Sequence, residues 1–134
     1  MSRNRIAPSL FYSLALVFLS GGYSAADNGE WRIYSEASNG DVYFFDESRV
    51  NSTSGLHQVW MRIRYKTSVM GASSYQSLLE VDCAERTERT LQRTFFSDRH
   101  WEDPAMSTDR KAKPKRSIQL GSATERLSEI LCAQ

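Results

Sequence analysis

The sequence is poor in the residues on which most enzyme and metal chemistry depends. It contains two cysteines and two histidines, His57 and His100, and these form neither a C-x-x-C pair nor a histidine cluster. A structural zinc site needs four such ligands, so no metal centre is expected. A phosphate-binding glycine loop and a serine in a nucleophile elbow are also absent. We therefore predict no catalytic residue, no cofactor and no metal site, and a protein that is not an enzyme.

An apolar run long enough to span a bilayer is missing as well. A short basic start is followed by ten apolar residues, 10–19, whereas a transmembrane helix needs about 20. Small residues come next, with Ser24 and Ala26 at positions that suit signal-peptide cleavage. We expect a signal peptide over residues 1–26 and one domain over residues 27–134. The mature protein would have no transmembrane span and would be exported to the periplasm or the outer cell surface.

Charge and cysteine content restrict the partners and the compartment. The formal net charge is +1, which gives no overall attraction to nucleic acid, and the export signal also argues against such a partner. Cys83 and Cys132 are the only cysteines. They lack the further ligands of a metal site, and an oxidising compartment favours a disulfide between them. Closing a loop of about 50 residues contributes roughly 4 kcal/mol in the chain-entropy model.

Alternating side chains identify a central pair of strands. Residues 57–66 place apolar side chains at odd positions and polar or cationic ones at even positions. This period of two predicts a half-buried strand with one apolar and one cationic face. Residues 75–83 continue with a second alternating run. The eight residues between them, 67–74, include Gly71 and several serines, and they predict a hairpin loop.

The cationic face of this hairpin carries Trp60, Arg62 and Arg64. The predicted pairing places Arg62 and Arg64 near Glu80 and Asp82, where opposite charges help to fix the register. Trp60 has three explanations among these cations: an arginine stem packs over its ring, the face is a recognition surface, or the face forms a homodimer. The sequence does not separate them.

The remaining pattern predicts an α+β fold. Short strands are expected at residues 31–34 and 42–45, and a longer strand at 87–97 whose charged middle suits an edge or a partly exposed strand. Residues 98–117 are expected to form a long loop. A C-terminal helix should begin at the Ser122–Glu125 capping box. We expect an antiparallel sheet of about five to six strands, with this helix packed on one face and clamped by the Cys83–Cys132 disulfide.

Five cations lie within residues 110–116, which we call the basic segment. They are Arg110, Lys111, Lys113, Lys115 and Arg116. Such a run is usually a solvated loop that needs no ligand. The alternative is a patch that binds a glycosaminoglycan, the phosphates of lipopolysaccharide or an acidic protein segment. These five residues, with Trp60, Arg62 and Arg64, are the candidate ligand-binding residues.

The combined motifs resemble the surface-adhesin protein E family across the whole chain after the expected signal peptide. The residues that carry the resemblance are Trp31, 42–46, 59–66, Ser77, 80–86, Arg89, Gly121, Ser122, Leu131 and Cys132. The resemblance implies an antiparallel sheet with a C-terminal helix, a disulfide between the two cysteines, and a periplasmic or surface location. It also implies binding of host matrix or serum proteins such as vitronectin and laminin. The chain departs from the family in its charged segment, and it lacks a lipobox cysteine.

Two functions follow as hypotheses. The first is an exported bacterial binding protein without enzymatic activity, which binds a host matrix or serum protein or an anionic polymer. The alternative is a periplasmic, envelope-associated structural protein that has no host ligand. Cell fractionation distinguishes them, because an adhesin must reach the cell surface.

Overall fold

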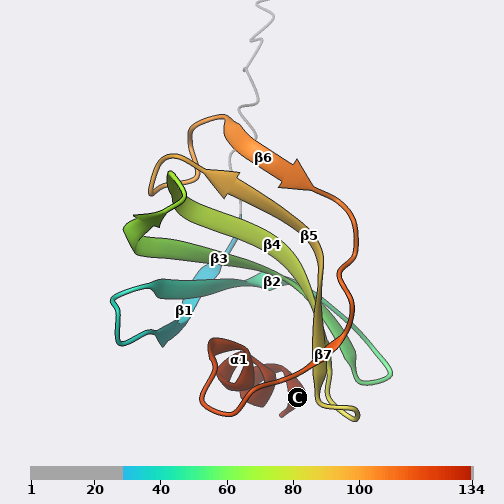
Figure 1. Ribbon diagram of the computed structural model, residues 1–134. Coiled ribbons are helices and arrows are strands. Elements are labelled where there is room, and N and C mark those ends of the chain that lie inside the picture. The colour runs from blue at the N-terminus through green and yellow to red at the C-terminus, as the bar shows by residue number, and fades with distance from the viewer. Residues whose placement is uncertain (1–28, 134) are drawn as a thin grey trace, which may run out of the picture.

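The structure, a computed structural model, describes residues 29–133. Within them, seven β-strands precede one α-helix (Figure 1). The elements are β1 (Trp31–Glu36), β2 (Val42–Thr53), β3 (Leu56–Val69), β4 (Ala72–Asp82), β5 (Thr87–Phe96), β6 (Ala105–Asp109), β7 (Arg116–Ser117) and α1 (Ala123–Cys132). The expected signal peptide, residues 1–26, lies outside the described residues. Among residues 29–133, no helix is long and apolar enough to cross a membrane.

The strands form one antiparallel sheet in which chain neighbours pair. The order is β1-β2-β3-β4-β5-β6, and β7 pairs with β5 near the start of that strand. Such a meander needs tight turns and no crossover connection. The expected antiparallel sheet and C-terminal helix are confirmed. The strand count exceeds the expected five to six because the two-residue β7 adds to the six of the meander.

The central hairpin is tighter than its sequence suggested. β3 continues to Val69 and β4 begins at Ala72, so Met70 and Gly71 alone form the turn. Both have positive φ, 50° and 83°, as a type I′ turn requires. The expected eight-residue loop over residues 67–74 is therefore wrong. The ends of two strands next to a hairpin turn are solvated as a loop is. Residues 67–74 therefore have a polar composition whether they form a loop or the ends of β3 and β4.

The cross-strand register also differs from the prediction. Across the hairpin, Arg62 faces Gln76, Arg64 faces Ser74, Glu80 faces Gln58 and Asp82 faces Leu56. The predicted pairing of Arg62 and Arg64 with Glu80 and Asp82 is wrong. Glu80 instead faces the next strand, where its Oε1 accepts a hydrogen bond from Arg89 Nε at 2.8 Å. The pairing shifts between Arg64 and Val69, where the ladder is irregular, so the residues next to the turn and those in the middle of the hairpin follow different registers.

The core is shared by the sheet and α1. Strand alternation places one set of side chains on the face that we call the core face: Phe45, Val59, Met61, Leu79 and Val81. Leu127 and Leu131 of α1 belong to the same buried cluster and are 0% and 1% exposed. Burial of each leucine stabilises the fold by about 1.5–3 kcal/mol. We call the other side of the sheet the outer face; it carries Phe44, Trp60, Arg62, Gln76 and Glu80.

β5 is an interior strand and not an edge strand, but most of its residues are partly exposed, as the other alternative for this strand predicts. It pairs with β4 on one side and with β6 and β7 on the other. The charges that suggested an edge form ion pairs, which are Glu88 with Arg116, Arg89 with Glu80 and Arg93 with Asp109. A strand with neighbours on both sides can carry charged side chains when each is paired with an opposite charge. The expected long loop over residues 98–117 is also wrong in part, because it contains β6 and β7.

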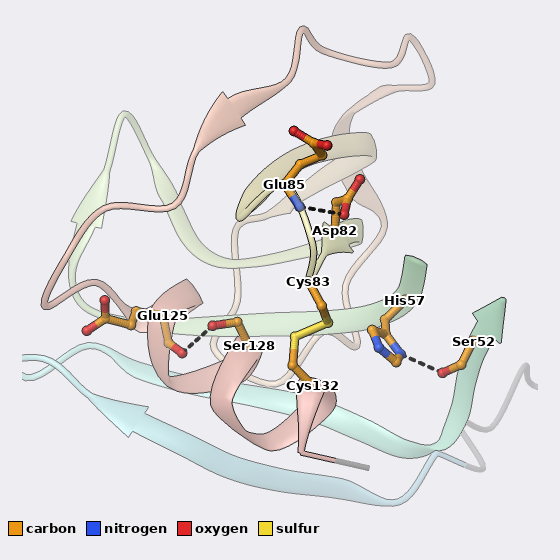
Figure 2. Close-up of a disulfide and its surroundings, with 8 residues drawn as sticks. All are labelled: Ser52, His57, Asp82, Cys83, Glu85, Glu125, Ser128 and Cys132. Carbon is orange, nitrogen blue, oxygen red and sulfur yellow. Dashed lines mark hydrogen bonds between the residues drawn. A yellow bond between two sulfur atoms is a disulfide. The ribbon is translucent and has the colours of Figure 1, made fainter. Parts of the chain in front are cut away.

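The two ends of α1 are fixed as the sequence predicts. Ser122 Oγ accepts a hydrogen bond from the Glu125 backbone N–H at 3.1 Å, so the N-cap is confirmed. The Glu125 carboxylate accepts a hydrogen bond from the Gly121 N–H at 3.2 Å. At the other end, the disulfide between Cys83 and Cys132 joins the end of β4 to the last turn of α1, which confirms the expected bond (Figure 2).

Candidate binding surface

Arg62 lies between two tryptophan rings on the outer face. Its Cζ atom is 4.1 Å from the centroid of the Trp31 ring and 4.6 Å from that of Trp101. Its Nε donates a hydrogen bond to Gln76 Oε1 at 2.8 Å. A cation–π contact contributes about 0.5–2 kcal/mol, depending on its exposure. The two rings and the hydrogen bond therefore hold this half-buried guanidinium group in one orientation.

Trp101 is positioned by a turn that follows β5. The Asp98 carboxylate accepts hydrogen bonds from three backbone N–H groups, which are those of His100, Glu102 and Asp103. Partial burial raises the pKa of Asp98, but these hydrogen bonds outweigh it and lower the pKa below its usual value. Trp101 itself has a φ of 57°, and its Nε1 donates to the Tyr75 carbonyl at 3.0 Å. The turn thus places the indole ring over the sheet.

Trp31 lies opposite Asp46 in the pairing of β1 with β2, and the carboxylate of Asp46 is buried. Asp46 is 0% exposed. It accepts hydrogen bonds from the Glu30 N–H and from the N–H and hydroxyl of Ser48, and it forms an ion pair with Arg49. Burial raises the pKa of Asp46, but the hydrogen bonds from Ser48 and Arg49 lower it below its usual value. Arg49 also approaches the Trp31 ring, at 5.9 Å.

A second arginine extends this arrangement. Arg64 Cζ lies 5.3 Å from the centroid of the Phe44 ring, and Phe44 makes an edge-to-face contact with Trp101 at 5.7 Å. We call Trp31, Phe44, Arg62, Arg64 and Trp101 the arginine–aromatic cluster. It joins β1, β2, β3 and the turn after β5. Trp and Arg are enriched at the energetic centres of protein interfaces, so the cluster can serve as a rigid contact surface.

Trp60 lies outside the cluster. It faces Leu78 across the strand pair and is half-buried, and within residues 29–133 it makes no cation–π contact. The structure therefore brings Arg62 and Arg64 together with aromatic rings, but not with the tryptophan nearest in sequence. Sequence reasoning missed Trp31 and Trp101 as their partners, because no local pattern connects these distant positions to β3.

The basic segment contains two cations that have a structural role. Lys113 Nζ lies 2.5 Å from Asp109 Oδ2, and Arg116 Nη2 lies 2.9 Å from Glu88 Oε1. The Lys113 backbone N–H also donates to the Thr90 carbonyl at 2.8 Å. These contacts attach the segment to β5 and β6, and they neutralise two of its five charges.

The other three cations of the segment, Arg110, Lys111 and Lys115, are exposed. Within residues 29–133, none of them forms an ion pair with a carboxylate. The charge of Lys115 affects the pKa of Glu80 on the outer face. Burial raises the pKa of Glu80, but hydrogen bonds, led by that from Arg89, and the charge of Lys115 together lower it. The segment thus presents unpaired positive charge close to the outer face of the sheet.

A histidine accompanies the disulfide (Figure 2). His57 is 8% exposed, and its Nδ1 lies 2.6 Å from Ser52 Oγ, so it is a buried, hydrogen-bonded histidine. A ring nitrogen of His57 and the sulfurs of Cys83 and Cys132 lie within 4.8 Å of one another. Metal ligation requires free thiolates, and these sulfurs are bonded to each other. We assign no metal to this group.

Comparison with known proteins places this geometry in a family. The family model for surface-adhesin protein E matches residues 31–133. A structure of Haemophilus influenzae protein E aligns with a TM-score of 0.60 at 12% identity, over 77% of this chain and 83% of that one. Another, from non-typeable Haemophilus influenzae, has a TM-score of 0.59 at 12% identity over 77% and 75%. No curated protein sequence matches the chain significantly.

The two kinds of match support different statements. At 12% identity, the structural likeness establishes the fold alone. The family model covers nearly all of the described residues and establishes membership. The chain belongs to the surface-adhesin protein E family, and it is accordingly a non-enzymatic, adhesin-like surface protein.

Proposed function

We propose that this protein is an exported adhesin that binds a host matrix or serum protein through its basic segment and the adjoining outer face. The observation that carries the proposal is the exposed charge of Arg110, Lys111 and Lys115, which have no ion-pair partner within residues 29–133. Lys113 and Arg116 already bind Asp109 and Glu88, so they contribute less to a partner. Exposed cations attract an acidic protein segment and raise the rate of association.

We also propose that α1 covers only the core face, which leaves the outer face free for the partner. Leu127 and Leu131 pack with the core-face residues, whereas the residues of the arginine–aromatic cluster remain half-exposed. This cluster would supply rigid contacts, because Arg62 is already fixed between its two rings. A preorganised side chain loses less conformational entropy on binding.

The experiment measures binding of the mature protein to immobilised vitronectin and laminin, the ligands that the family resemblance implies. The test variant combines Arg110→Ser, Lys111→Ser and Lys115→Ser. Exposed charges each contribute about 0.2–1 kcal/mol, so we expect the Kd to rise about tenfold. Higher salt should weaken the binding of the native protein more than that of the variant. Heparin, as a glycosaminoglycan, and lipopolysaccharide serve as anionic competitors.

A matched control separates local charge from net charge. The control variant combines Lys66→Ser, Arg99→Ser and Arg126→Ser, which removes the same charge from exposed positions elsewhere. We expect it to bind like the native protein. Equal loss in both variants, or no loss in either, would exclude the basic segment as the binding site. Labelling of intact cells tests surface display, and protein confined to the periplasm would favour the alternative role of an envelope-associated structural protein.

A further inference from the structure

A cavity of about 270 Å³ lies on the core face, beside the chain that leads into α1. Its lining includes residues from β1 to β5, Arg116 of β7 and the first residues of α1. The residues that carry the argument are Tyr34, Tyr43, Tyr75, Ser77, Glu88 and Arg116. No member of the arginine–aromatic cluster lines it, and neither does any of the three unpaired cations. It is therefore separate from the proposed adhesive surface.

Three buried residues line this cavity with polar atoms that lack a partner among residues 29–133. Both donors of Arg116, Nε and Nη2, converge on Oε1 of Glu88 at 3.3 and 2.9 Å, and Oε2 accepts no hydrogen bond there. Glu88 is 5% exposed, Ser77 1% and Tyr34 7%, and neither hydroxyl is hydrogen-bonded within the described residues. Buried polar atoms are almost always satisfied. Among residues 29–133 no polar side-chain atom is both closed off from solvent and without a partner. The unpartnered atoms of these three residues are therefore reached by solvent, and all three residues line the cavity.

The cavity also has flat aromatic walls. The rings of Tyr34 and Tyr43 lie 5.9 Å apart at an interplanar angle of 60°, and Tyr75 packs against Phe95 at 5.1 Å. Tyr43 and Tyr75 are only half-buried. Burial raises the pKa of Tyr34 well above its usual range, and Tyr43 and Glu88 add to the effect. The Tyr34 hydroxyl therefore remains a neutral donor at physiological pH.

These features select the chemistry of a ligand. The ion pair between Glu88 and Arg116 leaves the cavity without net charge, so a charged ligand would lose its hydration without compensation. Aromatic walls need an apolar face against them, and the unpartnered polar atoms need hydroxyl groups. The volume is below the range of about 300–1,000 Å³ typical of drug-sized ligands, so it suits a single ring. A sugar ring has both an apolar face and a rim of hydroxyls.

We propose that this cavity binds one neutral sugar ring, as the terminal unit of a glycan. Tyr43 and Tyr75 would contact the apolar face of the ring, while Glu88 Oε2 and Ser77 Oγ would hydrogen-bond to its hydroxyls. The site goes beyond the proposed binding of a matrix protein and does not depend on it.

The experiment is an NMR titration of the isotope-labelled mature protein with glucose, galactose, mannose and N-acetylglucosamine in turn. We expect saturable shifts of backbone signals in β3, β4 and β5 with at least one of these sugars. Ser77→Ala removes one neutral hydrogen bond and should raise the Kd about fivefold, and Glu88→Gln should raise it about tenfold or more. Glu85→Gln, in an exposed turn, is the matched control and should bind normally.

Two variants keep the test decisive. Glu88→Gln also removes the partner of Arg116 and can destabilise the fold, whereas Ser77→Ala changes no charge. Absence of saturable shifts with all four sugars would mean that the cavity holds water only, and it would overturn the proposal. Undiminished binding in both cavity variants would overturn it as well. Either result leaves the adhesive surface untouched, since that surface is tested with different residues.

Discussion

Removal of the Cys83–Cys132 bond is expected to destabilise the protein by about 4 kcal/mol while the fold is retained. The two cysteines are 49 residues apart, and the chain-entropy relation for a loop of this length gives about 4 kcal/mol at 25 °C. Small domains have total stabilities of roughly 5–15 kcal/mol. The bond therefore accounts for a large share of the free energy of unfolding.

Packing should keep α1 in place without the bond. Leu127 and Leu131 are 0% and 1% exposed in the core cluster, and burial of each is worth about 1.5–3 kcal/mol. The N-cap at Ser122 acts at the opposite end of the helix from Cys132 and does not depend on the disulfide. We therefore expect the helical circular dichroism signal to persist in the double variant Cys83→Ala/Cys132→Ala.

The assay is urea unfolding of the native and double-variant proteins, followed by circular dichroism and tryptophan fluorescence. The native protein treated with a phosphine reductant is the control for the substitutions themselves. A loss below about 1 kcal/mol would show that the bond does not restrict the unfolded chain as the relation assumes. Loss of the helical signal before unfolding of the sheet would refute the packing argument.

Three further predictions concern single contacts, and each cost is a loss in the free energy of unfolding measured by urea unfolding. Leu127→Ala should cost about 2–5 kcal/mol because it leaves a core cavity, whereas Leu120→Ala, at a residue that is 87% exposed, should cost almost nothing. Arg62→Lys should cost about 1 kcal/mol, because a lysine cannot stack between two rings as a guanidinium does, and Arg64→Lys, beside one ring, should cost less. Asp46→Asn should cost about 2–3 kcal/mol at neutral pH, through weakened hydrogen bonds to a charged group. The fold lowers the pKa of Asp46. Its contribution to the free energy of unfolding is therefore full above the pKa of the unfolded chain, about 4, and is lost as pH falls through the folded pKa. An Asp46→Asn variant whose stability depends on acid pH as that of the native protein does would contradict this.

Much of the fold follows from local signals in the chain. The alternation in residues 57–66 predicted β3, because a period of two is a property of the extended backbone itself. The Ser122–Glu125 spacing predicted the start of α1, because the capping hydrogen bonds join residues three apart. The disulfide followed from there being two cysteines in a chain that we expected to be exported. Each of these inferences needs only neighbouring residues or composition.

The register and the turns were harder to predict. Residues 67–74 are polar whether they form a loop or the exposed ends of two strands, so the two-residue turn at Met70 and Gly71 was missed. The error in the register of Glu80 arose separately, from the register shift between Arg64 and Val69. β6 and β7 were missed for a related reason, since they are short and mostly exposed and are held by pairing with β5.

The sequence by itself determined the fold class, the helix, the disulfide and the presence of a cationic strand face. The tertiary structure decided which of those cations are available to a partner. It inserted Arg62 between Trp31 and Trp101 and paired Lys113 and Arg116 with carboxylates. Within residues 29–133 it left Arg110, Lys111 and Lys115 without an ion-pair partner. The physical reason is that ion pairs and ring contacts act over a few ångströms between residues far apart in the chain, and only the folded arrangement brings them within reach.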